Sequence, residues 1–169
     1  MLYLKELNIK DSKQEYEFFK QMPSECGFEN EYENISYHDF ITHAIKERLD
    51  ASKGINLKPG FVPDTYYFLW YDNEIVGLFK IRHFLNDFLR NGPGHIGYGI
   101  LPKHRNKGYA SKGLTLALEK CQELLPQDET EVYLSVHKDN PASLKAQLHN
   151  QAYIHHENAT EYYTRIKIR

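Results

Sequence analysis

The chain has 169 residues, of which 41% are hydrophobic and 26% are charged, and its formal net charge is -2 at pH 7. This composition is that of an ordinary globular protein, and the charge argues against a general nucleic-acid binder, which would carry a basic surplus. No apolar stretch is long enough for a membrane span, and the two cysteines form neither a disulfide framework nor a metal-ligand pattern. We therefore expect a single cytoplasmic domain over residues 1–169, with no metal and no membrane partner.

The first half of the chain alternates between strand and helix signals. Apolar alternation predicts a strand from Leu2 to about Ile9. Ser12 and Glu15 form a capping box that opens a short helix, which ends before Pro23. Further predictions here are a second helix capped by Ser36 and Asp39, a loop around Pro59-Gly60, and a hairpin of strands 65–71 and 74–85 across Asp72-Asn73.

Residues 95–100 predict a strand with one filled face and one bare face. The filled face carries Ile96, Tyr98 and Ile100, and we interpret Tyr98 as a packing residue. The other face carries His95, Gly97 and Gly99. A face without side chains allows something other than a side chain to lie against the backbone.

A short basic loop joins this strand to a helix. Apolar residues recur every three or four positions up to Leu125, and Pro126 ends the pattern. The first N–H groups of a helix have no internal partner and lie at the positive end of its dipole. Glycine and alanine at this helix start, with cations beside them, predict a phosphate or pyrophosphate site.

The last third predicts a strand over 131–137, a helix from Asn140 or Pro141 to about His149, and a closing hairpin of 152–156 and 161–168. Taken with the first half, this order of elements indicates the α+β class, a mixed sheet covered by helices.

Arg105-Asn106-Lys107-Gly108-Tyr109-Ala110 resembles the Gln/Arg-x-x-Gly-x-Gly/Ala motif of the GNAT N-acetyltransferase family. An apolar pattern ending in Pro102 precedes it, and Asn140-Pro141-Ala142-Ser143 matches the family's later Asn-x-x-Ser/Ala. The resemblance covers the chain from Pro63 on. It implies a mixed, mostly antiparallel sheet whose central strands splay apart, and acetyl-coenzyme A as co-substrate. The positions implied to contact this co-substrate are Ile100, Leu101, Arg105, Asn106, Lys107, Gly108, Tyr109, Ala110, Asn140 and Ser143.

The resemblance implies an N-acetyltransferase that acts on a primary amine, either a small molecule or an amino-terminal group, by direct attack in a ternary complex. Gln147 stands where many members have a tyrosine that protonates the leaving thiolate. Tyr153, Tyr109 or solvent could replace it. The departure favours an alternative, a catalytically weak acyl-coenzyme A-binding sensor or partner module. The sequence is compatible with a homodimer.

Fewer residues are candidates for deprotonating or attracting the amine than for binding the co-substrate. His95 is the favoured proton acceptor because it shares a face with the glycines and titrates near neutrality; the alternative is a histidine that is merely hydrogen-bonded. The backbone N–H of Ile100 or Leu101 is expected to face the thioester carbonyl. Asn140 and Ser143 either touch the pantetheine arm or only cap their helix. The acidic segment 24–39 is either a solvated loop or helps to attract a cationic amine.

Overall fold

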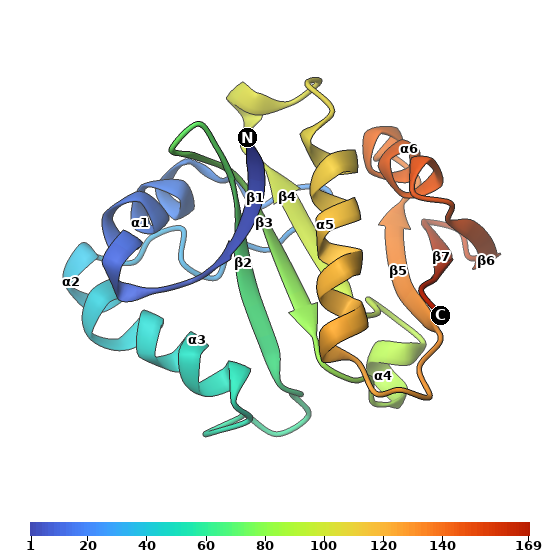
Figure 1. Ribbon diagram of the computed structural model, residues 1–169, viewed down its shortest axis with the longest axis horizontal. Helices are drawn as coiled ribbons and strands as arrows, with labels where there is room; N and C mark the ends of the chain where they lie inside the picture. Colours follow the sequence, from blue (N-terminus) through green and yellow to red (C-terminus); the bar gives the residue numbers. More distant parts are fainter.

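Two antiparallel sheets stand side by side in the computed structural model, which describes residues 1–169 (Figure 1). The first sheet has the order β1 (Leu2–Glu6), β2 (Asp64–Tyr71), β3 (Glu74–Arg82), β4 (Ile96–Ile100). The second has the order β5 (Glu131–His137), β7 (Glu161–Lys167), β6 (Tyr153–Glu157). The α+β class and the predicted order of the main elements are confirmed.

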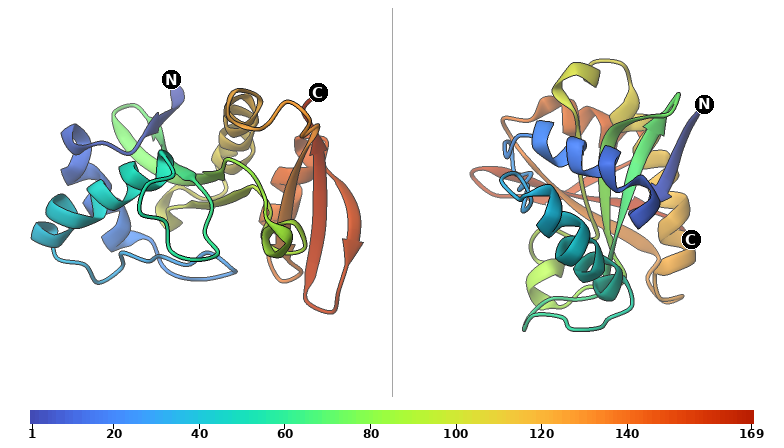
Figure 2. Two further views of the ribbon diagram at one scale, coloured as in Figure 1. Left: turned by 90° about the horizontal axis from the view of Figure 1, so that it is seen from below. Right: turned by 90° about the vertical axis from the view of Figure 1, so that its left-hand side faces the viewer.

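Helices cover both faces of the first sheet (Figures 1 and 2). On one face lie α1 and α3; Phe18 and Phe19 of α1 and Ile45 of α3 share a buried cluster with Phe68 of β2. On the other face lies α5, and Gly113 allows it to approach Phe79 of β3 closely. The helices are α1 (Ser12–Gln21), α2 (Tyr37–Asp39), α3 (Ile45–Ser52), α4 (Asp87–Arg90), α5 (Tyr109–Leu124) and α6 (Pro141–His149); the short turns are η1 (Ile9–Asp11), the π-helical η2 (Phe40–Ala44) and η3 (Pro102–His104).

The start of α1 differs from the prediction. The side chain of Asn8, not Ser12, accepts hydrogen bonds from the first free N–H groups, at the η1 turn. Glu15 accepts the Asn8 N–H at 2.9 Å, so its carboxylate faces inward. The prediction of a capping box was wrong because the 3-10 turn before α1 moves the cap four residues upstream, to Asn8. The same turn follows β1, which therefore ends at Glu6. Sequence reasoning also missed α4, which Asn86 caps.

The predicted hairpin between β2 and β3 is confirmed. Asp72 and Asn73 have φ of 46° and 66°, the pair of positive values that a type I′ turn requires. The turn joins β2 to β3, and in the adjacent ladder Lys80 of β3 lies opposite Gly97 of β4. This register places charged residues of β3 beside the glycines of β4.

Backbone hydrogen bonds join the two sheets at one place only. Gly94 and Leu134 form an isolated bridge, and the His95 N–H donates to the Tyr133 carbonyl at 2.7 Å. Beyond this junction β4 pairs only with β3 and β5 only with β7, so the strands separate. Gly94 has a φ of 71°, and a Cβ there would lie 2.1 Å from the Tyr133 oxygen, so only glycine fits.

Candidate active site

The edge of β4 that faces the gap has free backbone groups. Leu101 N–H donates to Val76 O at 2.9 Å and Arg82 N–H to His95 O at 2.8 Å, so these are hydrogen-bonded pairs of the β3–β4 ladder. In an antiparallel ladder such pairs alternate with residues whose N–H and C=O point the other way. Ile100 is one of the latter, since Gly77 is its partner in the register. Of the two amides predicted to face a thioester, Ile100 is therefore free and Leu101 is occupied.

The turn before α5 has the backbone that an anion site needs. Asn106 and Gly108 have φ of 61° and 78°, and a Cβ on Gly108 would meet nothing within 4 Å. No side chain caps α5, and the N–H groups of Tyr109, Ala110 and Ser111 have no partner in the chain. Three unpartnered donors at a helix start fit a pyrophosphate without further change.

The cations at this turn differ in their availability. Arg105 donates through Nε to the Ile100 carbonyl at 3.1 Å and forms an ion pair with Glu25. Lys107 and Lys112 are exposed and form no ion pair. The free positive charge beside the helix start therefore comes from the two lysines, whereas Arg105 ties the turn to the acidic segment.

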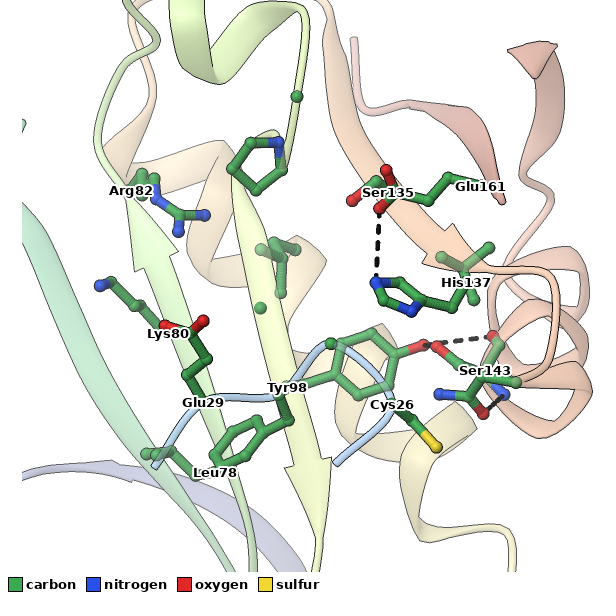
Figure 3. A pocket seen from close by; sticks show the side chains of 18 of the residues that line it. Cys26, Glu29, Leu78, Lys80, Arg82, Tyr98, Ser135, His137, Ser143 and Glu161 are labelled. Carbon is green, nitrogen blue, oxygen red and sulfur yellow. Dashed lines mark hydrogen bonds and ion pairs between the residues drawn. The ribbon is translucent and has the colours of Figure 1, made fainter. Parts of the chain in front are cut away.

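A cavity of about 560 Å³ opens between β3 and β4 on one side and β5 with the start of α6 on the other (Figure 3). Gly97 lies in its floor, and a Cβ there would meet nothing within 4 Å. Gly99 on the same face is covered by Met22 and Phe28, so the predicted bare face is open over half its length. The ionisable and hydroxyl-bearing residues that line the cavity are Cys26, Glu29, Glu31, Tyr66, Lys80, Arg82, Tyr98, Ser135, His137, Ser143 and Glu161.

Tyr98 connects the two walls of the cavity. Its ring stacks on Phe79 with centroids 5.2 Å apart, as expected of a packing residue. Its hydroxyl, however, lies 2.7 Å from the hydroxyl of Ser143 at the start of α6, and Asn140 caps that helix by accepting the Ser143 N–H at 3.2 Å. Burial raises the pKa of Tyr98, so the phenol holds its proton at neutral pH.

The other tyrosines considered as proton donors lie elsewhere. Tyr153 donates to Glu131 on the exposed β6 edge, and the ring of Tyr109 lies against Tyr71. Gln147 is buried, and its amide oxygen accepts the Thr164 hydroxyl at 2.6 Å. None of these three residues, Tyr153, Tyr109 and Gln147, lines the cavity, whereas Tyr98 does.

His95 lies outside the cavity. Its side chain is fully buried in the junction of the sheets, where Nδ1 accepts the Tyr133 N–H at 2.9 Å. Burial, helped by Arg90 and two further arginines, lowers the pKa of His95 to about 3. A neutral ring without access to the cavity supports the alternative, a hydrogen-bonded structural histidine, over a proton acceptor.

His137 and Glu161 are cavity residues that sequence reasoning missed. They are partners in the β5–β7 register, and His137 Nε2 lies 3.6 Å from Glu161 Oε1 (Figure 3). The imidazole faces the cavity and can exchange a proton with a group bound there. No sequence signal joins the two residues, because their contact depends on which strands pair.

Three features follow one another along the gap: a helix start that suits a pyrophosphate, a free strand edge, and a cavity with a proton-accepting side chain. This arrangement suits a group-transfer protein whose donor substrate contains a phosphate group. Residues 21–147 match the Acetyltransferase (GNAT) family. The chain belongs to this family, as the resemblance implied, and is an acyltransferase; the family uses acetyl-coenzyme A.

Solved structures show the same fold at low sequence identity. A ribosomal-protein alanine acetyltransferase from Vibrio fischeri has a TM-score of 0.71 at 13% identity, covering 98% of this chain and 92% of its own. The spermidine/spermine N-acetyltransferase SpeG from Vibrio cholerae, in mutant form, has 0.62 at 16%, covering 99% and 95%. The paia N-acetyltransferase from Thermoplasma acidophilum in complex with coenzyme A has 0.58 at 14%, covering 99% of each.

No curated protein matches the chain in sequence. None of the helices has the length and apolar character needed to cross a membrane. No group of three or more histidine, cysteine, aspartate or glutamate side chains is placed to hold a metal ion.

Proposed function

We propose that residues 1–169 form one N-acetyltransferase domain that transfers the acetyl group of acetyl-coenzyme A to a primary amine, by direct attack in a ternary complex. The observation that carries the proposal is the free edge of β4, which runs from the phosphate turn to the cavity and leaves the Ile100 N–H unpaired. The amine is a small molecule or an amino-terminal group.

The donor would be held by groups that the chain leaves unused. The N–H groups of Tyr109, Ala110 and Ser111 bind its pyrophosphate, and Lys107 and Lys112 add charge. The pantetheine arm follows the unpaired edge of β4, and Ser143 lies where it would enter the cavity. The thioester carbonyl then faces the Ile100 N–H.

Each chemical step has a group in the cavity or on the free edge of β4 beside it. The ammonium gives its proton to His137, and Glu161 beside it stabilises the imidazolium that forms. The neutral nitrogen attacks the carbonyl carbon, and the negative charge on the oxygen is stabilised by the Ile100 N–H. As the oxyanion re-forms the carbonyl, the carbon–sulfur bond breaks and the thiolate takes its proton from the Tyr98 hydroxyl. The second proton of the amine nitrogen leaves through solvent, which also reprotonates the Tyr98 phenolate.

A second function is favoured by one observation. Gln147 has no acidic proton and its oxygen is bonded to Thr164, so the usual proton donor of the family is absent from its position. An acyl-coenzyme A-binding module without turnover would bind the donor equally well. Release of coenzyme A with any amine of a broad panel separates the two functions.

The first test is a thermal melt with acetyl-coenzyme A, desulfo-coenzyme A, ATP and NAD. At a hundredfold excess over its dissociation constant a true ligand adds about 2.7 kcal/mol, which raises the Tm of a chain this long by about 5–10 °C. We expect this rise for the two coenzyme A compounds only. Gly108→Trp should abolish it, because the indole occupies the space in front of the helix start.

Gly60→Trp is the matched control. Gly60 has a φ of 82°, and a Cβ there also meets nothing within 4 Å, so both variants carry the same backbone strain. The control should keep the coenzyme A shift. An equal shift with ATP, or none with coenzyme A compounds, contradicts an acetyl-coenzyme A site.

A further inference from the structure

The β3 wall of the cavity carries more positive charge than the buried carboxylates beside it can neutralise. Lys80 and Arg82 lie on the same face of β3 and line the cavity; the Arg82 guanidinium is directed into it, whereas the Lys80 ammonium turns toward Asp64 (Figure 3). Behind them Arg48 stacks on Tyr66, with its guanidinium 4.9 Å from the ring centre. One buried carboxylate, Asp64, serves this group: it lies 3.2 Å from Arg48 Nη1 and 3.6 Å from Lys80 Nζ.

Arg82 has no acidic partner. Its Nη1 donates to the Gly94 carbonyl at 2.9 Å, and no carboxylate oxygen lies within 4.0 Å of its guanidinium. Its remaining donors line the cavity. Burial lowers the pKa of both Lys80 and Arg82, and the attraction of Asp64 and Glu31 opposes this shift only in part. An anion in the cavity would supply the missing partner.

The acidic residues of the cavity do not contact the two cations. Glu29 and Glu31 are exposed at the rim and form no ion pair with Lys80 or Arg82; Glu31 attracts both only from a longer distance, where solvent screens it. Glu161 lies with His137 on the β5–β7 wall, across the Gly97 floor from Lys80 (Figure 3). A molecule over Gly97 thus meets cations at one end and a proton acceptor beside a carboxylate at the other.

We propose that the acceptor is an amine that also carries a carboxylate, and that Lys80 and Arg82 bind this carboxylate while the amine faces His137. The proposal rests on the proposed acetyl transfer. The acceptor is then a zwitterion, such as an amino acid. The exposed Glu29 and Glu31 at the rim only attract its ammonium group during approach.

The test measures coenzyme A release with matched pairs of acceptors. The pairs are L-leucine and L-leucinamide, L-methionine and L-methioninamide, β-alanine and β-alaninamide, and 4-aminobutyrate and its amide. We expect kcat/KM to be ten- to a hundredfold higher for the carboxylates, as for other charge-assisted hydrogen bonds. An α-amide has more neutral amine at a given pH, so the basicity difference works against the expected preference.

Variants assign the preference to the cationic wall. Arg82→Gln keeps a donor for the Gly94 carbonyl, and Lys80→Met leaves Asp64 paired with Arg48. Each should bring the carboxylate and amide values to within threefold of one another. Lys13→Gln removes an exposed cation of α1 and should keep the preference. Two variants at different positions keep the test valid if one of them fails to fold.

The outcomes separate this inference from the proposed function. Turnover with equal or greater rates for the amides overturns the inference and leaves acetyl transfer standing. If neither series is turned over, melts in the presence of coenzyme A decide: a Tm rise with L-leucine or 4-aminobutyrate, absent with the amides and in Arg82→Gln, supports the carboxylate site. No difference between acids and amides in those melts overturns it.

Discussion

At the scale of single residues, two histidines near the gap differ in what surrounds them. The ring of His95 is enclosed by the junction of the sheets and accepts a backbone N–H, so it holds the strands in place. His137 lies on the cavity wall with Glu161 beside it and has room for a bound amine. Access to the substrate, not residue type, decides which of them can carry a proton.

Substitution of His137 and of Tyr98 should affect the two proton transfers separately. His137→Gln should lower kcat/KM about 10²–10⁴-fold and remove the acidic limb of its pH profile, because a base must be neutral to accept the proton. Tyr98→Phe should lower kcat while the acidic limb stays, because the base is intact. Steady-state rates of coenzyme A release across pH 5–9 measure both.

His38→Gln is the control for the histidine substitution, since His38 is an exposed residue of α2 outside the cavity. It should leave the pH profile unchanged. A His137→Gln enzyme that keeps the wild-type acidic limb would show that another group accepts the proton. Wild-type turnover in Tyr98→Phe would show that solvent protonates the thiolate.

At the scale of elements, β4 belongs to the first sheet, and the backbone just before it, at Gly94 and His95, bonds to the second sheet. One edge of β4 is bonded to β3 along its length, and the other edge meets β5 only at the Gly94 bridge. Past this bridge the strands separate, and the unpaired edge becomes a place for a ligand with its own hydrogen-bonding groups. The junction glycine is therefore as important to the site as the residues in the cavity.

Gly94→Ala should destabilise the protein by about 1–3 kcal/mol from the clash with the Tyr133 oxygen, beyond the roughly 1–2 kcal/mol that a left-handed alanine costs. Gly60→Ala has a similar φ in open space and should show only the second cost. Urea unfolding of both variants measures the difference. Equal destabilisation of the two would mean that the sheets can move apart freely at the junction.

At the scale of the whole molecule, one buried carboxyl makes the stability depend on pH. Glu15 on α1 is 1% exposed, and burial raises its pKa to about 8. A carboxyl whose folded pKa lies above its unfolded value of 4.5 stabilises the fold at low pH. This stabilisation is lost as the pH rises from 4.5 through 8, because the unfolded chain releases the proton first.

Between pH 6.5 and 8 we expect the free energy of unfolding to fall by about 1–2 kcal/mol. His95 acts only weakly in this window and with the opposite sign, since a pKa lowered from 6.5 reduces stability mainly below pH 6.5. Urea unfolding at pH 6.5, 7.2 and 8 measures the slope. Glu15→Gln should flatten it, and equal slopes in the variant and the wild type would rule out Glu15 as the cause.

The sequence by itself determined the features that depend on neighbouring residues. The positive φ pair at Asp72-Asn73, the end of α5 before Pro126, and the glycine at the start of that helix follow from local backbone chemistry, which the chain carries wherever it folds. The motif from Arg105 to Ala110 was recognisable for the same reason, since a phosphate turn needs consecutive residues.

Only the tertiary structure decided which distant residues share the cavity. Pairing of β5 with β7 places His137 beside Glu161, and the same strand arrangement buries His95 at the junction. The register of β3 and β4 places Lys80 beside Gly97. Local periodicity shows which face of a strand a residue occupies, but the neighbours on that face are set by packing between elements far apart in the chain.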